Sequence, residues 1–143
     1  MCGIIGYTGK GKAAKIMLDA LELLEYRGYD SAGIALLSRG VTQIVKAAGR
    51  VKDLRRLCEE KKPEGQCGIG HTRWATHGGV CDENAHPHRF GNVTLIHNGI
   101  IENYRELIEK YSLEGQLKPE TDSEVVAAVL EHFYSGDPYS AIR

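Results

Sequence analysis

The first six residues, Met1-Cys2-Gly3-Ile4-Ile5-Gly6, place a cysteine directly behind the initiator methionine, at the start of a short apolar strand. Removal of Met1 would give Cys2 a free α-amine beside its thiol. Unperturbed, the amine titrates near ~7.7–8.0 and the thiol near ~8.5, so both exchange protons at neutral pH. Such an N-terminal nucleophile is activated by its own amine. The alternative is a small buried residue that opens a strand, and the hexapeptide by itself favours this alternative.

The bulk composition is that of one globular domain. The chain has 143 residues, 42% hydrophobic and 26% charged, with a formal net charge of −1, so no global field favours nucleic acid or an anionic membrane. The longest apolar runs, 32–37 and 125–130, fall far short of the ~20 residues that cross a bilayer, and the start lacks the layout of a signal peptide. We expect a cytoplasmic protein whose partners include neither nucleic acid nor membrane.

Cysteine and histidine spacing gives no sign of a metal or disulfide framework. The four cysteines, at positions 2, 58, 67 and 81, form no C-x-x-C pair and are expected to be free thiols. Histidines at 71, 77, 86 and 88 lie near two of them, but their spacings match no structural zinc pattern. A Cys-His dyad at 67 or 81 stays open without a supporting signature. Phosphate-loop and dinucleotide fingerprints are absent, so no cofactor is expected.

Apolar periodicity predicts hairpins mixed with helices. The predicted strands cover residues 2–7, 31–37, 41–47, 67–74 and 92–97, and the predicted helices start near residues 13, 51, 102, 121 and 137. Residues 59–66 are expected to form an exposed connector and 75–89 a long polar loop, and the sequence TDSE at 121–124 has the pattern of a capping box. The pattern indicates an α+β fold with antiparallel sheet, not a doubly wound parallel fold.

Three positions could carry chemistry, each with a structural alternative. Asn98-Gly99 follows a strand and could direct an amide and a backbone N–H at an oxyanion, or could be an ordinary Asn-Gly turn. Arg73 could hold a carboxylate through two parallel hydrogen bonds, or pair with an acid at the surface. Asp122 could bind an ammonium group, or simply favour the dipole of its helix.

Six ordered stretches together resemble one family, over almost the whole chain. The chain is similar to the class II glutamine amidotransferases, in particular to the domain found in glutamine–fructose-6-phosphate aminotransferases. The sequences YRGYDSAG at 26–33 and HTRWATHG at 71–78 favour this group over the amidophosphoribosyltransferases and asparagine synthetases. The six stretches are CGIIGYTG at 2–9, LEYRGYDSAGIALL at 24–37, HTRWATHG at 71–78, NAHPH at 84–88, HNGIIENY at 97–104 and TDSEVV at 121–126.

The resemblance implies a role for each matching residue. Cys2, freed of Met1, would be the nucleophile and its α-amine the general base, while the Asn98 side chain and the Gly99 N–H would form the oxyanion hole. No metal is implied. The implied substrate contacts are Arg73 on the α-carboxylate of glutamine, Asp122 on its α-ammonium, Thr76 and His77 in a loop that closes over it, and Trp74 at the exit for ammonia.

The resemblance also implies a fold and a reaction. The fold is an N-terminal-nucleophile αββα sandwich of antiparallel sheets. The family's domain continues past residue 143, so we expect a C-terminally incomplete sandwich: residues 1–143 as the N-terminal portion of a glutaminase domain, with the sugar-phosphate isomerase domains absent. Glutamine would be hydrolysed through a Cys2 thioester, and those domains would use the ammonia to make glucosamine 6-phosphate.

Two other functions stay open at this point. One is a non-catalytic glutamine-binding or interaction module, and the other is a stand-alone N-terminal-nucleophile amidohydrolase. Missing layers would leave apolar sheet exposed and favour a homo-oligomer.

Overall fold

The computed structural model describes residues 2–75, 78–118 and 121–143. Most predicted strands and helices are confirmed to within a few residues. The strands are β1 (Gly3–Thr8), β2 (Ser31–Ser38), β3 (Val41–Ala48), β4 (Cys67–Arg73), β5 (His88–Phe90) and β6 (Val93–Leu95). The helices are α1 (Ala13–Leu24), a 3-10 turn η1 (Glu25–Arg27), α2 (Val51–Lys61), α3 (Tyr104–Lys110), α4 (Asp122–Phe133) and α5 (Pro138–Ile142).

The first four strands form one antiparallel sheet in the order β1-β4-β2-β3. The register of β1 on β4 sets Gly3 opposite Thr72, and the Gly3 N–H donates to the Thr72 hydroxyl at 3.0 Å. A Cβ at Gly3 would lie 2.6 Å from that hydroxyl and 2.7 Å from Cβ of Leu24, so only glycine fits. Cys2 is therefore held where β4 ends.

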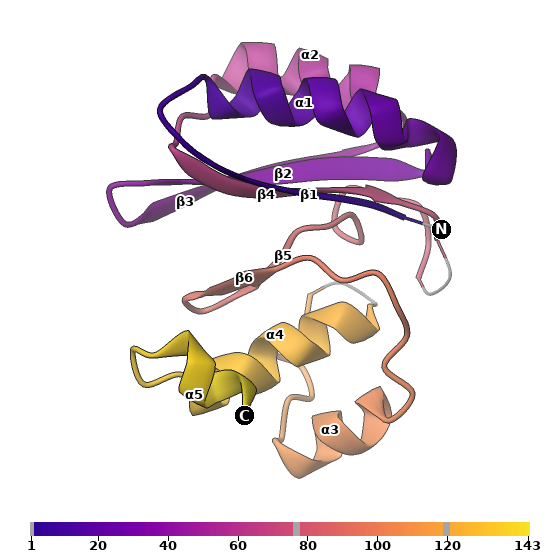
Figure 1. The fold of residues 1–143 in the computed structure, drawn as a ribbon. Coiled ribbons are helices and arrows are strands. Elements are labelled where there is room, and N and C mark those ends of the chain that lie inside the picture. The colour runs from indigo at the N-terminus through magenta and orange to yellow at the C-terminus, as the bar shows by residue number, and fades with distance from the viewer. Residues whose placement is uncertain (1, 76–77, 119–120) are drawn as a thin grey trace.

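Helices and strands are stacked in four layers (Figure 1). Helices α1 and α2 cover one face of the large sheet, and the β5–β6 hairpin lies against the other, with α3 and α4 beneath it. The core between the first two layers contains fully buried Met17, Leu21, Ile34, Leu36 and Leu54. This α–β–β–α order confirms the predicted α+β class, and the second sheet has two strands within the described part of the chain.

The β5–β6 hairpin corrects two predictions. Residues 88 and 89 were expected in a loop, but His88 pairs with Leu95, and the next strand is Val93–Leu95 rather than 92–97. Helix α4 stabilises the turn between β5 and β6, because the Glu131 carboxylate accepts the N–H groups of Asn92 at 2.9 Å and Val93 at 3.1 Å. The hairpin thus depends on a residue about 40 positions later, which alternation within the strands could not reveal.

The connector after α2 is shorter than predicted. The helix continues to Lys61, and Lys62 takes the left-handed conformation with φ 47°, a common helix ending. Helical residues therefore replace the first part of the expected 59–66 connector, and Pro63 within the remainder is buried rather than exposed.

Residues 84–88 (NAHPH), which include two histidines and an asparagine, are buried between the layers. Ala85 and His88 are almost fully enclosed. This segment crosses β2 so closely that a Cβ at Gly33 would overlap the His86 carbonyl oxygen. Glycine in this strand therefore allows a second backbone to approach, and brings the buried histidines to the inner face of the large sheet.

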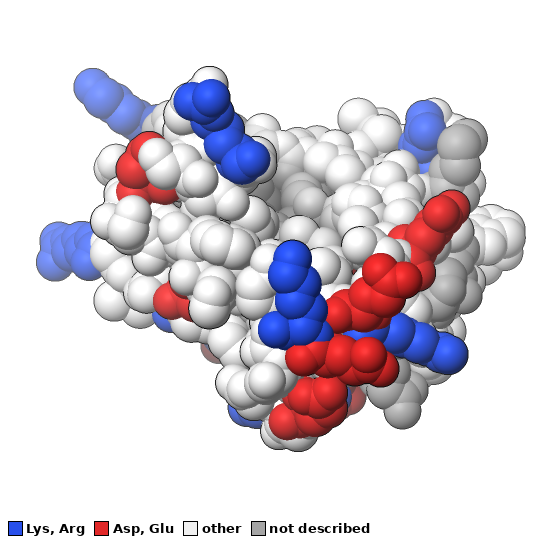
Figure 2. Space-filling view, turned by 90° about the horizontal axis from the view of Figure 1, so that it is seen from below, with Lys and Arg blue, Asp and Glu red and all other residues white. Residues whose placement is uncertain are grey.

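The charged side chains are unevenly distributed. On the face in Figure 2, most of the visible Asp and Glu gather in one group beside several Lys and Arg, a few others lie apart from it, and much of the rest of that face is uncharged. Across the described ranges, every helix is too short or too polar to cross a lipid bilayer.

Candidate active site

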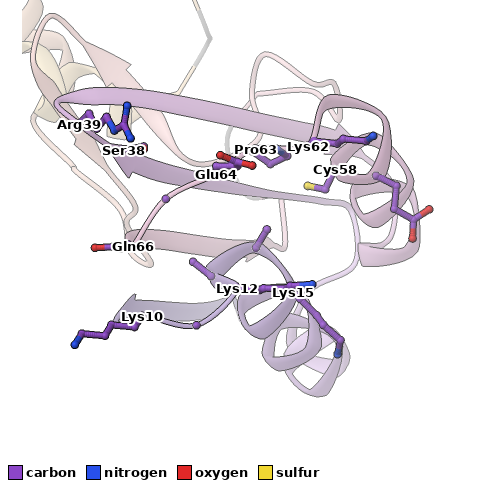
Figure 3. Close-up of a pocket in the computed structure, with 15 residues that line it drawn as sticks. Lys10, Lys12, Lys15, Ser38, Arg39, Cys58, Lys62, Pro63, Glu64 and Gln66 are labelled. Carbon is purple, nitrogen blue, oxygen red and sulfur yellow. The ribbon is translucent and has the colours of Figure 1, made fainter.

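Among the described residues, two hollows of a size to hold a small molecule lie in different parts of the fold. The larger, of about 940 Å³, lies where α1 begins and α2 ends (Figure 3). Its Lys10 and Lys62 side chains extend in opposite directions. Burial raises the pKa of its Cys58 thiol to about 11, so that thiol is a poor nucleophile at neutral pH. We therefore assign no chemistry to this hollow.

The smaller hollow, of about 370 Å³, brings together every candidate residue that the structure describes. Thr76 and His77 lie outside the described residues. The walls come from the start of β1, the end of β4, the segment after β6 and the first turn of α4. The predicted residues that line it are Cys2, Arg73, Trp74, Asn98, Gly99 and Asp122, and the further ones are His71, His86, His97, Ile100, Thr121 and Ser123.

Cys2 lines this cavity and is partly exposed. The backbone N–H of Trp74 donates to Cys2 Sγ at 3.4 Å. The Cys2 thiol in turn donates to the Trp74 carbonyl oxygen at 4.0 Å, so the backbone of Trp74 holds Sγ through both of its polar groups. The alternative of a small buried residue is wrong, because Cys2 is partly exposed and lines a cavity.

Arg73 is 5% exposed, so the alternative of a surface arginine is also wrong. Its Nη1 donates to the Gly79 carbonyl at 3.1 Å and its Nη2 to that of Gly78 at 3.4 Å. Burial lowers the pKa of Arg73, and nearby Asp30 opposes this effect, yet guanidinium remains charged in proteins. The two hydrogen bonds are to neutral carbonyls, which a carboxylate can displace to form stronger charge-assisted bonds.

Asn98 and Gly99 stand at the cavity edge and are exposed. Neither has a positive φ, so they do not form the type I′ hairpin turn in which Asn-Gly is common. The His97 ring packs against Gly99, where a Cβ would lie 2.7 Å from His97 Nε2. The Gly99 backbone therefore lies directly against the His97 imidazole, and both residues line the cavity.

The predicted capping box at the start of α4 is wrong. Thr121 occupies the N-cap position without a side-chain cap bond, and its hydroxyl instead bonds His88 Nε2 at 3.1 Å. The Glu124 carboxylate accepts the N–H of Lys118 at 3.1 Å rather than that of Thr121. The two side chains are used to hold neighbouring segments, so local sequence alone misassigned their partners.

Asp122 also makes a contact across the fold. Its Oδ2 accepts the backbone N–H of Ile101 at 2.7 Å, and the residue is 7% exposed. One carboxylate can accept several hydrogen bonds, so this contact leaves capacity for a cationic group in the cavity. Asp122 therefore holds the segment after Asn98 and also presents negative charge to the cavity.

Three buried histidines form a column at the cavity wall, and two of them, His71 and His86, line the cavity. The His71 and His86 rings stack at a centroid distance of 4.2 Å, and His86 meets His88 at 4.3 Å. Burial lowers the pKa of all three, that of His71 to about 4 and that of His88 to about 3, so they are neutral at physiological pH. Among the residues that the structure describes, no group of three or more His, Cys, Asp or Glu could hold a metal.

Sequence reasoning overlooked the residues that support the site. His71, His86 and His88 were considered only for a metal site or a Cys-His dyad, His97 was given no role, and Ser123 was considered only as part of a cap. The available signal was that four of the site histidines and Ser123 fall inside matching family stretches. Periodicity and spacing could not show that these stretches meet in space.

Comparisons with known proteins show which family the chain belongs to. Residues 71–141 match the family described as glutamine amidotransferase domain. The chain is 53% identical to the glutamine–fructose-6-phosphate aminotransferase of Caldanaerobacter subterraneus subsp. tengcongensis, over 100% of this chain and 24% of that protein. It is 50% identical to the same enzyme of Aquifex aeolicus, over 99% and 24%. The chain thus spans about a quarter of the length of these curated relatives.

Solved structures give the same assignment. The glutamine phosphoribosylpyrophosphate amidotransferase of Bacillus subtilis, complexed with ADP and GMP, matches 99% of this chain and 31% of its own at a TM-score of 0.81 and 26% identity. A structure described as the allosteric regulatory enzyme of purine biosynthesis matches 99% and 32% at a TM-score of 0.82 and 28% identity. The chain therefore belongs to the glutamine amidotransferases, and it matches the N-terminal glutaminase part of the glutamine–fructose-6-phosphate aminotransferases.

Proposed function

We propose that this chain hydrolyses glutamine to glutamate and ammonia through a thioester on Cys2. The observation that carries the proposal is the convergence of four groups on one 370 Å³ cavity. These are a thiol, a buried guanidinium, a buried carboxylate and the Asn98-Gly99 pair. A small amino acid with an amide side chain would use all four: the guanidinium and carboxylate for its charged end, and the thiol and amide pair for its reacting end.

The proposed reaction needs only the groups of the chain and water. With Met1 removed, the α-amine of Cys2 takes the thiol proton, and the thiolate attacks the amide carbon of glutamine. The Asn98 amide and Gly99 N–H stabilise the negative carbonyl oxygen. The ammonium of Cys2 then gives its proton to the departing amine, so ammonia leaves and a thioester remains. Water cleaves the thioester, which releases glutamate and restores the thiol.

Substrate recognition is proposed to use the buried charges. Arg73 would exchange its bonds to the Gly78 and Gly79 carbonyls for the α-carboxylate, and Asp122 would accept the α-ammonium. Thr76 and His77 remain proposed members of the closing loop. Trp74 lines the cavity and is exposed, with its ring centroid 5.6 Å from that of Tyr29 in a T-shaped arrangement, which fits a proposed role in controlling the escape of ammonia.

The proposal is tested by glutamate release from protein whose intact mass shows that Met1 has been removed. Cys2→Ala should abolish release. Cys67→Ala is the matched control, because Cys67 is an exposed free thiol at the opposite end of β4. Turnover by the Cys2→Ala protein would overturn the mechanism, as would full activity in protein that retains Met1. Competition by other small amides separates a glutaminase from a broader amidohydrolase.

We further propose the wider setting that the relatives suggest. Residues 1–143 would act as one glutaminase unit with glutamine as substrate and no cofactor. Its ammonia would be used by sugar-phosphate isomerase domains to make glucosamine 6-phosphate, in the cytoplasm, within a homo-oligomer. A non-catalytic glutamine-binding module is the alternative, and it predicts glutamine binding without glutamate release.

A further inference from the structure

We propose that Ser123 is a positioning residue that fixes the oxyanion turn, defined as residues 97–101, by holding the His97 ring. The inference rests on the proposed function, because Asn98 and Gly99 can serve as a pair of oxyanion donors only if the turn keeps one conformation. Preorganised donors are worth more than mobile ones because they need no reorganisation during the reaction. The residue that sets the turn therefore influences rate without touching substrate.

The first turn of α4 holds the oxyanion turn at both ends. At one end, the Ser123 hydroxyl lies 3.2 Å from Nδ1 of His97. The same hydroxyl donates to Asp122 Oδ1 at 3.4 Å, so its oxygen is left to accept a hydrogen bond from Nδ1–H of His97. At the other end, Asp122 Oδ2 accepts the N–H of Ile101 at 2.7 Å. Two consecutive side chains therefore bracket Asn98 and Gly99.

The main chain of His97 has its own anchors, so Ser123 acts on the ring. His71 Nε2–H donates to the His97 carbonyl at 3.1 Å, and the His97 N–H donates to His86 Nδ1 at 3.4 Å. Both anchors persist if the Ser123 hydroxyl is removed. What changes is the ring, which packs directly behind Gly99. Ring rotation would thus shift the Gly99 N–H while the strand before it stays in place.

Burial makes the hydroxyl hard to replace. Ser123 is 2% exposed, and its hydroxyl makes its hydrogen bonds to protein groups, the His97 ring and the Asp122 carboxylate. A buried donor left without an acceptor is costly, and the His97 ring would turn or change tautomer to find another partner. A displacement of about 1 Å in a reacting group can cost on the order of 10²-fold in rate. The serine is therefore expected to matter for turnover more than for substrate affinity.

The test compares Ser123→Ala with its conservative counterpart Ser123→Thr and with Ser31→Ala. Ser31 is also fully buried, but its hydroxyl has no hydrogen-bond partner among the described residues. For Ser123→Ala we expect kcat for glutamine to fall about tenfold to a hundredfold with KM changed less than about twofold, since the donors act in the transition state. Ser123→Thr should recover most of the loss, and Ser31→Ala should show none.

Two further measurements separate positioning from a general structural effect. Alkylation of Cys2 by iodoacetamide, followed on the Cys2 peptide by mass spectrometry, needs no oxyanion donors and should keep its wild-type rate in Ser123→Ala. The nitrogen chemical shifts of the His97 ring should show Nδ1–H in the wild type and a change in Ser123→Ala, together with a shift of the Gly99 amide.

Unchanged kcat in Ser123→Ala would overturn the inference, as would an equal loss of kcat and of Cys2 alkylation. If the wild-type protein released no glutamate, the proposed function would be overturned separately. The His97 and Gly99 resonances would then decide whether Ser123 fixes the turn, and their constancy in Ser123→Ala would show that it does not.

Discussion

The Trp74 backbone N–H donates to Cys2 Sγ at 3.4 Å, and 72 positions of sequence separate the two residues. The contact follows from sheet register, because Gly3 on β1 faces Thr72 on β4. Paired strands fix such a relationship more firmly than loops can. The proposed nucleophile is thus positioned by the backbone of the large sheet, while its oxyanion donors are positioned by α4.

Replacing Asn98 by alanine should reduce kcat for glutamine by about 10²–10³, the usual cost of losing one oxyanion donor. Asn98 is exposed, so the free energy of unfolding should be nearly unchanged. Steady-state kinetics together with urea denaturation check both parts. A variant with wild-type kcat would show that the amide is not a donor, and Asn103→Ala, also exposed, is a suitable control.

Arg73→Lys should raise KM for glutamine about tenfold or more, because lysine cannot give two parallel hydrogen bonds to one carboxylate. The analogue 4-aminobutanamide lacks the α-carboxylate and supplies the comparison. Wild-type protein should process it poorly, and Arg73→Lys should lower that activity little further. Equal losses on both amides would mean that Arg73 supports the cavity rather than recognising the carboxylate.

Gly33→Ala should lower the free energy of unfolding by about 2–3 kcal/mol, since overpacking of a tight site costs this much. The added Cβ would overlap the His86 carbonyl oxygen. Gly6→Ala in β1 is the matched control, because nothing lies within 4 Å of its Cβ position. Urea denaturation measures both, and equal stabilities would show that the buried crossing at residues 84–88 can move away.

The buried histidines predict loss of stability in acid. Folded-state pKa values fall to about 4 for His71 and about 3 for His88, chiefly through burial, whereas unfolded histidine titrates near ~6.5. Above pH ~6.5 neither state binds these protons, and the full stability is present. As pH falls from ~6.5 to ~4, only the unfolded state binds them. The free energy of unfolding should then decrease by up to ~1.4 kcal/mol per pH unit for each histidine.

Urea denaturation at pH 7.5 and pH 5.0 measures this slope. His88→Asn should be less stable than wild type at pH 7.5 but should lose less on acidification, because one titrating group is gone. A wild-type slope in His88→Asn would mean that His88 binds its proton equally in both states.

Much of the fold could be predicted because its strands and helices have clear periods. The stripe at Met17 and Leu21 predicted α1, and the turn at Gly40 predicted the β2–β3 hairpin. The β5–β6 hairpin was missed because its strands are three residues long and its first is polar, with His88 turned to the interior. Its stability comes from Glu131 and from burial, and neither can be recognised in a short window of sequence.

The residues of the site with distinctive chemistry could be predicted from the sequence, but the residue proposed to hold them in position could not. Cys2, Arg73 and Asp122 are chemically distinctive, and the family resemblance gave each an expected role. Ser123 has no distinctive chemistry of its own. Its importance comes from lying between the His97 ring and the Asp122 carboxylate, which only the packing of α4 on the oxyanion turn reveals.

The placement of Cys2 directly ahead of β1 decides how the protein should be produced for these experiments. An affinity tag or protease remnant fused before Cys2 would turn its α-amine into an amide. The thiol of Cys2 would then lack its proposed base. Purification handles therefore belong at the carboxyl end. An inactive preparation with an amino-terminal tag would say nothing about the chemistry of the native chain.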